Sequence, residues 1–242
     1  MSKAIRNVTK ASKSYPKKTQ KYSIIIPCAG QGSRMLSFGA KSLIKIKNNE
    51  TLIDRQLKIL NDIFVKKEII LITGFESEKV MENTPDYLIK IENPYYDTTN
   101  VLKSISIGLR AATTDNVIIV YGDLFFNHNI FMVPFNNESM IVVDSSGHMK
   151  EDEVGCILHD NYLQHMCYEL PNKWAQIIFL TGKELQIFSQ IAHNKKNSKH
   201  FGFEAINALL ELGGKLIPFF PENAIVTDMD CHQDLQRIKK IK

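Results

Sequence analysis

Two kinds of hydrophobic pattern alternate along the first half of the chain. Short unbroken runs of aliphatic and β-branched residues predict buried strands, and apolar residues spaced three or four positions apart predict helices with one buried face. Their alternation is typical of βαβ crossovers, so we expect an α/β fold with a Rossmann-like, mostly parallel sheet and helices on both faces. The predicted strands are 22–27, 68–73, 87–92 and 117–121, and the predicted helices are 52–64, 76–82 and 99–111.

The second half of the chain is more mixed, and we expect it to form a smaller region with some antiparallel strands. Thr181 and Glu184 have the spacing of a capping box, which predicts a helix that begins there. Two more helices are expected, over 203–212 and from about residue 233. The predicted strands are 140–143, 156–159, 162–167, 175–180, 215–219 and 224–228.

The positive charge of the chain is concentrated at its amino terminus. The formal net charge is +4, but residues 1–21 carry seven lysines and arginines and no acidic residue, which leaves −3 for residues 22–242. We therefore predict a basic leader over 1–21 and one domain over 22–242. The leader has few apolar residues and lacks interleaved aromatic residues, so we expect a solvated segment, or an arm on a second subunit of a homo-oligomer, rather than a nucleic-acid surface.

Several protein classes are excluded by what the sequence lacks. The apolar runs are far shorter than the roughly 18 residues of a membrane span, and no secretory hydrophobic segment is present at the start. The four cysteines lie far apart without a C-x-x-C pair, and no H-x-H or H-E-x-x-H spacing occurs. We expect a cytoplasmic protein with reduced thiols and without a histidine-built metal site.

The loop after the first predicted strand has the chemistry of a phosphate cradle. Residues 27–35 read Pro-Cys-Ala-Gly-Gln-Gly-Ser-Arg-Met, and closely spaced glycines let backbone N–H groups approach an anion. Arg34 and Lys41 add positive charge beside this loop, which suits a nucleoside triphosphate. Met35 stands where the dinucleotide-binding fingerprint has its third glycine, and no Walker A run exists.

Residues 27–35, followed by Ala40-Lys41-Ser42-Leu43, resemble the signature loop of the GT-A-type nucleotidyltransferases. At the position of Ala40 that family usually has proline. Residues 93–104 resemble the segment near the base and ribose in the phosphocholine-type cytidylyltransferases. Asp123 matches the family's metal aspartate, and residues 228–235 resemble its second metal site. The resemblance covers about 22–125 and 215–240, and not the middle of the chain.

The resemblance implies a role for each matching residue. Arg34 and Lys41 would neutralise the phosphates and act in catalysis, and the matching aspartates would hold Mg²⁺, which prefers oxygen ligands. The implied nucleotide contacts are Ala29, Gly30, Gln31, Gly32, Ser33, Gly74, Asn100, Ser104 and Asp123, and the implied metal ligands are Asp123, Asp228 and Asp230. A purely structural alternative exists for Asp230, which has capping-box spacing with Gln233.

The expected activity follows from charge. The phosphate or phosphonate of a small acceptor is already ionised at pH 7, so it needs positioning and electrostatic stabilisation rather than a general base to attack the α-phosphorus. We therefore expect transfer of a nucleotidyl group, CMP from CTP in the favoured form, with release of pyrophosphate. Tyr168 and Trp174 are candidates for a cage around a cationic acceptor, and a core position for Trp174 is the alternative.

Other functions stay open at this point. A sugar-1-phosphate nucleotidylyltransferase would use UTP, GTP or another nucleotide with the same groups. A GT-A glycosyltransferase is disfavoured because its D-x-D motif usually follows a mid-chain strand, whereas Asp228 and Asp230 lie near the carboxyl terminus. A non-catalytic nucleotide-binding module would have lost the need for Lys41 and Asp123.

Overall fold

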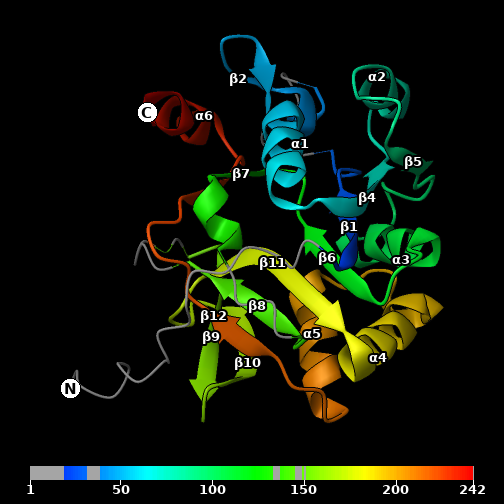
Figure 1. Cartoon of the computed structure of the whole chain (residues 1–242), viewed down its shortest axis with the longest axis vertical. Helices are drawn as coiled ribbons and strands as arrows, with labels where there is room; N and C mark the ends of the chain where they lie inside the picture. Colours follow the sequence, from blue (N-terminus) through cyan, green and yellow to red (C-terminus); the bar gives the residue numbers. More distant parts are fainter. Residues whose placement is uncertain (1–18, 32–38, 133–136, 145–148, 150, 242) are drawn as a thin grey trace.

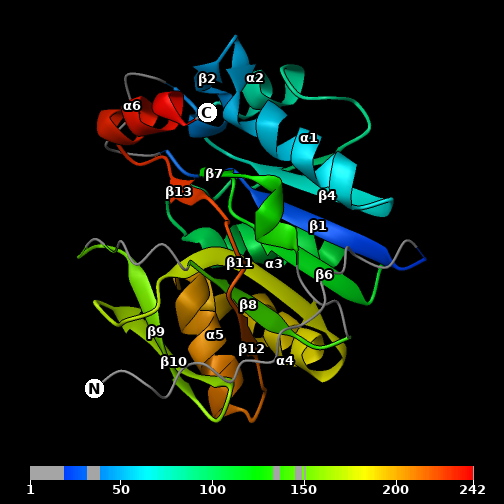
Figure 2. The ribbon, with the colours of Figure 1, turned by 60° about the vertical axis from the view of Figure 1, so that its left-hand side comes forward.

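A seven-stranded sheet forms the centre of the protein (Figures 1 and 2). The structure is a computed structural model that describes residues 19–31, 39–132, 137–144, 149 and 151–241. β11 pairs antiparallel with both of its neighbours, and all other pairs in this sheet are parallel. The predicted mostly parallel α/β sheet is therefore confirmed. In spatial order the strands are β12 (Ile217–Phe219), β8 (Met140–Val143), β11 (Trp174–Thr181), β6 (Asn116–Val120), β1 (Lys21–Pro27), β4 (Lys66–Thr73) and β5 (Ile89–Glu92).

Helices cover both faces of the sheet, so its central strands are buried on both sides. In β1, Ile24 and Ile26 face the core under α1, whereas Ile25 faces the core under the helices of the opposite face. All three isoleucines are fully buried, as expected where successive side chains point to opposite covered faces. The helix on the first face is α1 (Leu52–Ile63), and those on the second are α3 (Val101–Ala111), α4 (Gly182–His193) and α5 (Gly202–Glu211).

A glycine sets how closely α3 approaches the sheet. A Cβ atom added at Gly108 would lie 2.5 Å from Cγ2 of Ile25, well inside van der Waals contact. Gly108 therefore lets the helix backbone rest directly on the side chain of the central strand, at the usual cost of glycine within a helix.

The carboxyl-terminal segment returns to the middle of the molecule. β13 (Val226–Asp228) pairs antiparallel with β7 (Leu124–Phe126), which follows β6. The last helix, α6 (His232–Lys240), buries Leu235 and Ile238 in a third apolar cluster with Ile44 and Phe125. This return brings residues 228–230 to the end of β6. The remaining strands and α-helix are β2 (Lys45–Lys47), β3 (Glu50–Thr51), α2 (Ser77–Glu82) and a hairpin of β9 (Val154–His159) and β10 (Tyr162–Tyr168). Short 3-10 helices are η2 (Lys41–Leu43), η3 (His128–Phe131) and η4 (Lys195–Asn197).

Most predicted elements are confirmed within one to three residues, and the exceptions are short. β2, β3 and β7 were not predicted, because runs of two or three residues carry no readable period. The predicted capping box of α4 does not form. The Thr181 hydroxyl donates instead to the Asp115 carbonyl, and the Glu184 carboxylate accepts from the backbone N–H of Lys215.

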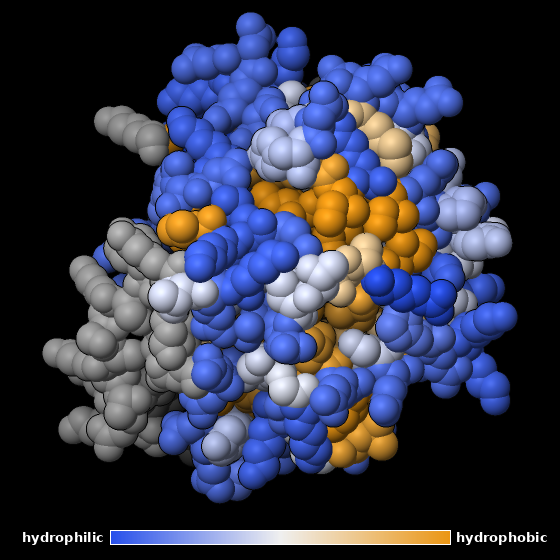
Figure 3. Space-filling view, turned by 45° about the vertical axis from the view of Figure 1, so that its right-hand side comes forward, coloured by the Kyte–Doolittle hydropathy of each residue, from blue (hydrophilic) through white to orange (hydrophobic). Residues whose placement is uncertain are grey.

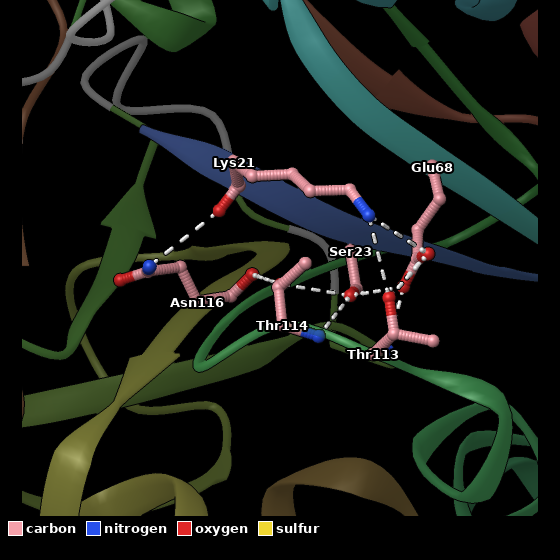
Figure 4. A network of polar contacts seen from close by, with 6 residues as sticks. All are labelled: Lys21, Ser23, Glu68, Thr113, Thr114 and Asn116. Atoms are coloured by element: carbon pink, nitrogen blue, oxygen red, sulfur yellow. Dashed lines mark hydrogen bonds and ion pairs between the residues drawn. The ribbon is translucent and has the colours of Figure 1, made fainter. Parts of the chain in front are cut away.

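A polar network ties the amino ends of the central strands together (Figure 4). The Glu68 carboxylate accepts hydrogen bonds from the Ser23 hydroxyl at 2.6 Å and from both the backbone and the hydroxyl of Thr113 at 2.7 Å. Lys21 lies 3.7 Å from the same carboxylate. Burial acts to raise the pKa of Glu68, but these hydrogen bonds and Lys21 outweigh it and lower the pKa. The network at this edge of the sheet therefore holds β1, β4 and the segment before β6 together.

The surface shown in Figure 3 is hydrophilic over most of its area, with apolar residues gathered near its centre. None of the helices in the described ranges has the length and apolar composition needed to cross a bilayer.

Candidate active site

A cavity of about 500 Å³ opens at the edge of the sheet where β1, β5 and β6 end. Its walls are the glycine loop after β1, the segment from Asn93 to Ser104 after β5, and the residues Tyr121 to Asp123 after β6. Lys41, Ser42, Gln176 of β11 and Phe201 complete the lining. Ligands of open parallel sheets bind at this edge, so the cavity lies where the sequence pattern predicts it.

The described part of the glycine loop faces this cavity. Ala29, Gly30 and Gln31 line it, and within the described residues, the two chain neighbours aside, no atom lies within 4 Å of the position of a Cβ on Gly30. Gly74 is not a lining residue, in contrast to the expected nucleotide contact. A Cβ there would lie 2.8 Å from that of Ala29 and 2.7 Å from that of Tyr96, so Gly74 lets the chain after β4 pack behind the loop.

Three of the candidate residues, Gly32, Ser33 and Arg34, lie outside the described residues.

Lys41 lies between two aspartates that come from distant parts of the chain. Its Nζ donates to Oδ1 of Asp230 at 2.5 Å and lies 3.4 Å from Oδ2 of Asp123. Asp123 follows β6 and Asp230 follows β13. A backbone hydrogen bond from Met229 N to the Asp123 carbonyl, 2.9 Å long, fixes the two segments side by side. The structure thus brings together the predicted lysine and two of the predicted metal ligands.

The helix that follows Asp230 does not use its side chain as a cap. Cys231 is the N-cap residue of α6, and the Asp234 carboxylate accepts from the backbone N–H groups of Cys231 and Asp230 at 3.0 and 3.2 Å. The capping role proposed as the alternative for Asp230 is therefore wrong. Asp234 satisfies the end of the helix, and the carboxylate of Asp230 pairs with Lys41.

Asp228 lies near a second lysine, Lys173, whereas Asp123 and Asp230 lie beside Lys41. It is buried, and its Oδ1 lies 3.7 Å from Nζ of Lys173, which also pairs with Glu153 at 2.6 Å. Burial raises the pKa of Asp228 to about 6, with Lys173 opposing and the neighbouring Asp230 adding to the rise. The structure places Asp228 against Lys173 and Asp230, which supports a positioning role for it.

The charges around Lys41 depend on one another. Burial acts to lower the pKa of Lys41, but attraction to Asp123 and Asp230 outweighs it and raises the pKa, so the side chain is an ammonium at neutral pH. Burial raises the pKa of Asp123, and Lys41 offsets this only in part. For Asp230 the pull of Lys41 outweighs burial, and the pKa is lowered.

Asp123 and Asp230 fit a divalent cation with few protein ligands. Within the described residues, no three Asp, Glu, His or Cys side chains are grouped as a complete metal centre. Two carboxylates that converge on one positive charge are nevertheless the usual protein contribution to a Mg²⁺ site, where water and substrate phosphates supply the other ligands. In this structure the Lys41 ammonium provides that positive charge.

The segment after β5 forms a rigid wall of the cavity. Asn93 is buried, its Nδ2 donates to the Ser104 hydroxyl at 3.1 Å, and its Oδ1 accepts from the backbone of Tyr95. The Asn100 side chain donates to the carbonyl of Lys199. Asn100 and Ser104 line the cavity, as the resemblance implies, and so does Asn93, which begins the matching segment but was not named as a contact. The Asn-Pro pair that ends the strand was the available signal for it.

The predicted aromatic cage is not assembled. Trp174 is only 4% exposed, its ring packs edge-on against Tyr121, and its Nε1 donates to the Ile177 carbonyl. Tyr168 packs instead against Phe203. Neither Trp174 nor Tyr168 lines the cavity. Trp174 thus takes the alternative core position, because an indole flanked by buried strands is stabilised there by apolar contacts.

The sequence analysis also missed three residues on the side of the cavity near β11. Tyr121, Gln176 and Phe201 all line it. The first two belong to or directly follow predicted strands, and a polar residue inside an apolar run was the signal that Gln176 offered.

A glycine loop, a lysine and two aspartates thus lie together at the carboxyl edge of a mostly parallel sheet, the edge at which open α/β sheets bind their ligands. Residues 24–137 match the model of the MobA-like NTP transferase domain. Comparison with curated proteins by sequence gives no match.

Solved structures share the fold over nearly the whole chain. The CTP:phosphocholine cytidylyltransferase of Streptococcus pneumoniae superposes with a TM-score of 0.76 at 15% identity, covering 90% of this chain and 98% of that one. The inositol-1-phosphate CTP transferase of T. maritima gives 0.71 at 15%, covering 90% and 96%. The nucleoside-diphosphate-sugar pyrophosphorylase of Vibrio cholerae RC9 gives 0.70 at 14%, covering 90% and 100%. The predicted resemblance and fold are therefore confirmed.

Proposed function

We propose that this protein transfers a nucleotidyl group, CMP from CTP in the favoured form, to a small acceptor that carries a phosphate or phosphonate. The observation that carries the proposal is the Lys41 ammonium held between Asp123 and Asp230 in the cavity beside the glycine loop. The MobA-like NTP transferase domain over residues 24–137 supports nucleotide transfer as the general activity.

The transfer is an in-line displacement at phosphorus. An oxygen of the acceptor phosphate forms a bond to the α-phosphorus of the nucleotide, the bond from that phosphorus to the α,β-bridging oxygen breaks, and pyrophosphate leaves with the electron pair. The attacking oxygen is already ionised, so no side chain has to remove a proton. The energetic obstacle is the approach of two anions, which preorganised positive charge reduces.

The residues of the cavity, and Asp230, which pairs with Lys41, divide this work. Gly30 and its neighbours offer backbone N–H groups, and Lys41 offers a full positive charge, to the phosphates. The wall from Asn93 to Ser104 holds the nucleoside side. Asp123 and Asp230 would hold Mg²⁺, which would supply further positive charge between the two substrates.

CTP is favoured over other nucleotides for two reasons. The segment from Asn93 to Ser104, which resembles that of the cytidylyltransferases, lines the cavity. Two of the solved structures that share the fold are CTP-using transferases by their descriptions. The pyrophosphorylase neighbour keeps a second candidate, a sugar-1-phosphate nucleotidylyltransferase with another nucleotide.

The test is a pyrophosphate-release screen of the full chain with Mg²⁺, four nucleoside triphosphates and a panel of phosphorylated amines, phosphonates, polyol phosphates and sugar phosphates. We expect release with CTP and one acceptor class. Asp123→Asn and Asp230→Asn should each lower kcat by about 10²–10³-fold. Asp62→Asn, at an exposed carboxylate on α1 that pairs with His128, serves as the matched control and should leave kcat unchanged.

Three outcomes would contradict the proposal. Transfer of a sugar without pyrophosphate release would indicate a glycosyltransferase. Nucleotide binding without turnover of any acceptor would indicate a binding module. Full activity of either aspartate variant would remove the metal role assigned to that residue.

A further inference from the structure

One strand residue at the cavity wall has an unusual backbone conformation. Gln176, in β11, has a φ of +55°. Ten non-glycine residues in the described ranges have positive φ, and seven of them are Asn or Asp, the types that tolerate this region best. Among the ten, Gln176 alone lies within a strand of the described structure. Such a conformation costs free energy and persists where the surroundings or the function require it.

The strand is irregular at the same place. Trp174 pairs with Val143 of β8, and the next pair is Ile178 with Ile141. Between these two pairs β11 advances by four residues and β8 by only two. A bulge of this kind bends a strand and redirects a side chain. The residues of β11 on either side of Gln176 in its row, Trp174 and Ile178, are buried. The single polar residue of the row, Gln176, instead lines the cavity.

The order of strands indicates which substrate Gln176 meets. The glycine loop follows β1 and the nucleoside wall follows β5, whereas Asp123 follows β6, which lies between β1 and β11. Gln176 near the start of the antiparallel strand β11 is therefore on the far side of Asp123 from the nucleotide contacts. The acceptor has to approach the α-phosphate from that side.

We propose that Gln176 determines acceptor specificity and that the acceptor is a small phosphorylated compound bearing hydroxyl groups, a polyol or sugar phosphate. The proposal rests on the nucleotidyltransferase function proposed above. A carboxamide both donates and accepts hydrogen bonds, as a hydroxyl does, and Tyr121 and Phe201, which line the same cavity, carry no charge. A trialkylammonium group offers no hydrogen-bond donor, and the aromatic cage that would bind it is not assembled.

The experiment combines acceptor kinetics with thermal stability in the full chain. Gln176→Gly removes the amide and relieves the positive φ, Gln176→Asn keeps an amide on a residue type that tolerates it, and Asp160→Gly relieves a positive φ of +49° in the exposed turn between β9 and β10 as the matched control. The probes are glycerol phosphate, inositol phosphate and a sugar 1-phosphate, with phosphocholine as the acceptor that lacks a hydroxyl.

For the best hydroxylated acceptor, Gln176→Gly should lower kcat/KM about tenfold or more, because a site built around a hydrogen bond loses that interaction. The KM for the nucleotide should stay unchanged and Tm should rise. Gln176→Asn should keep more of the acceptor kcat/KM than Gln176→Gly. Asp160→Gly should raise Tm and leave the kinetics unchanged.

The two proposals fail in different ways. A wild-type chain that releases pyrophosphate with none of the acceptors overturns the proposed function and this inference with it. An active wild-type chain whose relative kcat/KM values for hydroxylated acceptors and phosphocholine are the same in Gln176→Gly overturns the inference alone, and so does a preference of the wild-type chain for phosphocholine.

Discussion

Replacement of Lys41 by methionine tests whether the lysine neutralises two carboxylates in the absence of a metal ion. The ammonium lies 3.4 Å from Asp123 and is hydrogen-bonded to Asp230. At 3.4 Å and an effective dielectric constant of about 20, one such pair has a Coulomb energy of about 5 kcal/mol before desolvation is subtracted. The three side chains are 15%, 29% and 31% exposed, which places them between surface pairs and fully buried pairs.

The expected net effect is therefore intermediate. Exposed pairs are worth about 0–1 kcal/mol, and breaking a fully buried pair costs about 3–5 kcal/mol. We expect Lys41→Met to lower the free energy of unfolding at pH 7 by about 2 kcal/mol, or about 4–8 °C in Tm for a chain of this size. The loss arises because two carboxylates then face each other without a neutralising charge.

Mg²⁺ provides the discriminating measurement, and it needs no turnover. In the wild-type chain a cation has to displace the ammonium from Asp123 and Asp230, whereas in Lys41→Met the carboxylates are unpaired. Added Mg²⁺ should therefore raise the Tm of the variant more than that of the wild type, since binding to the native state stabilises it by mass action. A tenfold gain in affinity would return about 1.4 kcal/mol at saturating metal. Differential scanning fluorimetry over a Mg²⁺ titration measures both effects.

Lys79→Met is the matched control, because Lys79 is exposed and pairs with Glu76 on the surface. Its Tm should change little and its response to Mg²⁺ should equal that of the wild type. The idea that Lys41 neutralises Asp123 and Asp230 in the absence of a metal ion is refuted if Lys41→Met is as stable as the control, or if Mg²⁺ shifts the Tm of all three chains equally.

Two further predictions concern the frame of the fold. The lowered pKa of Glu68 means that its charged form stabilises the folded state above its ordinary pKa of about 4.5 and that this contribution is lost as the pH falls below that value. Glu68→Gln should therefore lower the free energy of unfolding by about 1–2 kcal/mol at pH 7. A urea-denaturation series in which the difference between variant and wild type does not shrink toward pH 3 would contradict the assignment. Gly108→Ala gains up to about 1 kcal/mol of helix propensity but places a methyl group 2.5 Å from Ile25, where overpacking costs about 1–3 kcal/mol. Thermal unfolding should therefore show a net loss of stability. A stabilised variant would show that α3 can move away from the sheet.

The glycine-loop side of the cavity was predictable because its residues follow the carboxyl ends of predicted strands. The glycine loop follows β1, Lys41 lies in the same connection, and Asp123 follows β6, so the rule that ligands bind at the carboxyl edge of a parallel sheet, together with the family resemblance, pointed to them. Asp230 required more. Its spacing from Gln233 fits a helix cap as well as a metal site. Only the pairing of β13 with β7, far apart in the sequence, places its carboxylate beside Asp123.

Long-range packing also explains why the prediction of an aromatic cage was wrong. Trp174 and Tyr168 were considered for their side-chain chemistry, but the position of Trp174 is set by a buried strand whose neighbours, β6 and β8, no local pattern identifies. The amide of Gln176 interrupts an otherwise apolar run from Trp174 to Leu180. In a strand buried on both faces such an interruption is unfavourable unless the polar group reaches a cavity or a partner. A lone polar residue in a buried central strand is therefore a better sign of a position at a cavity than a conspicuous aromatic residue, whose burial is favourable in itself.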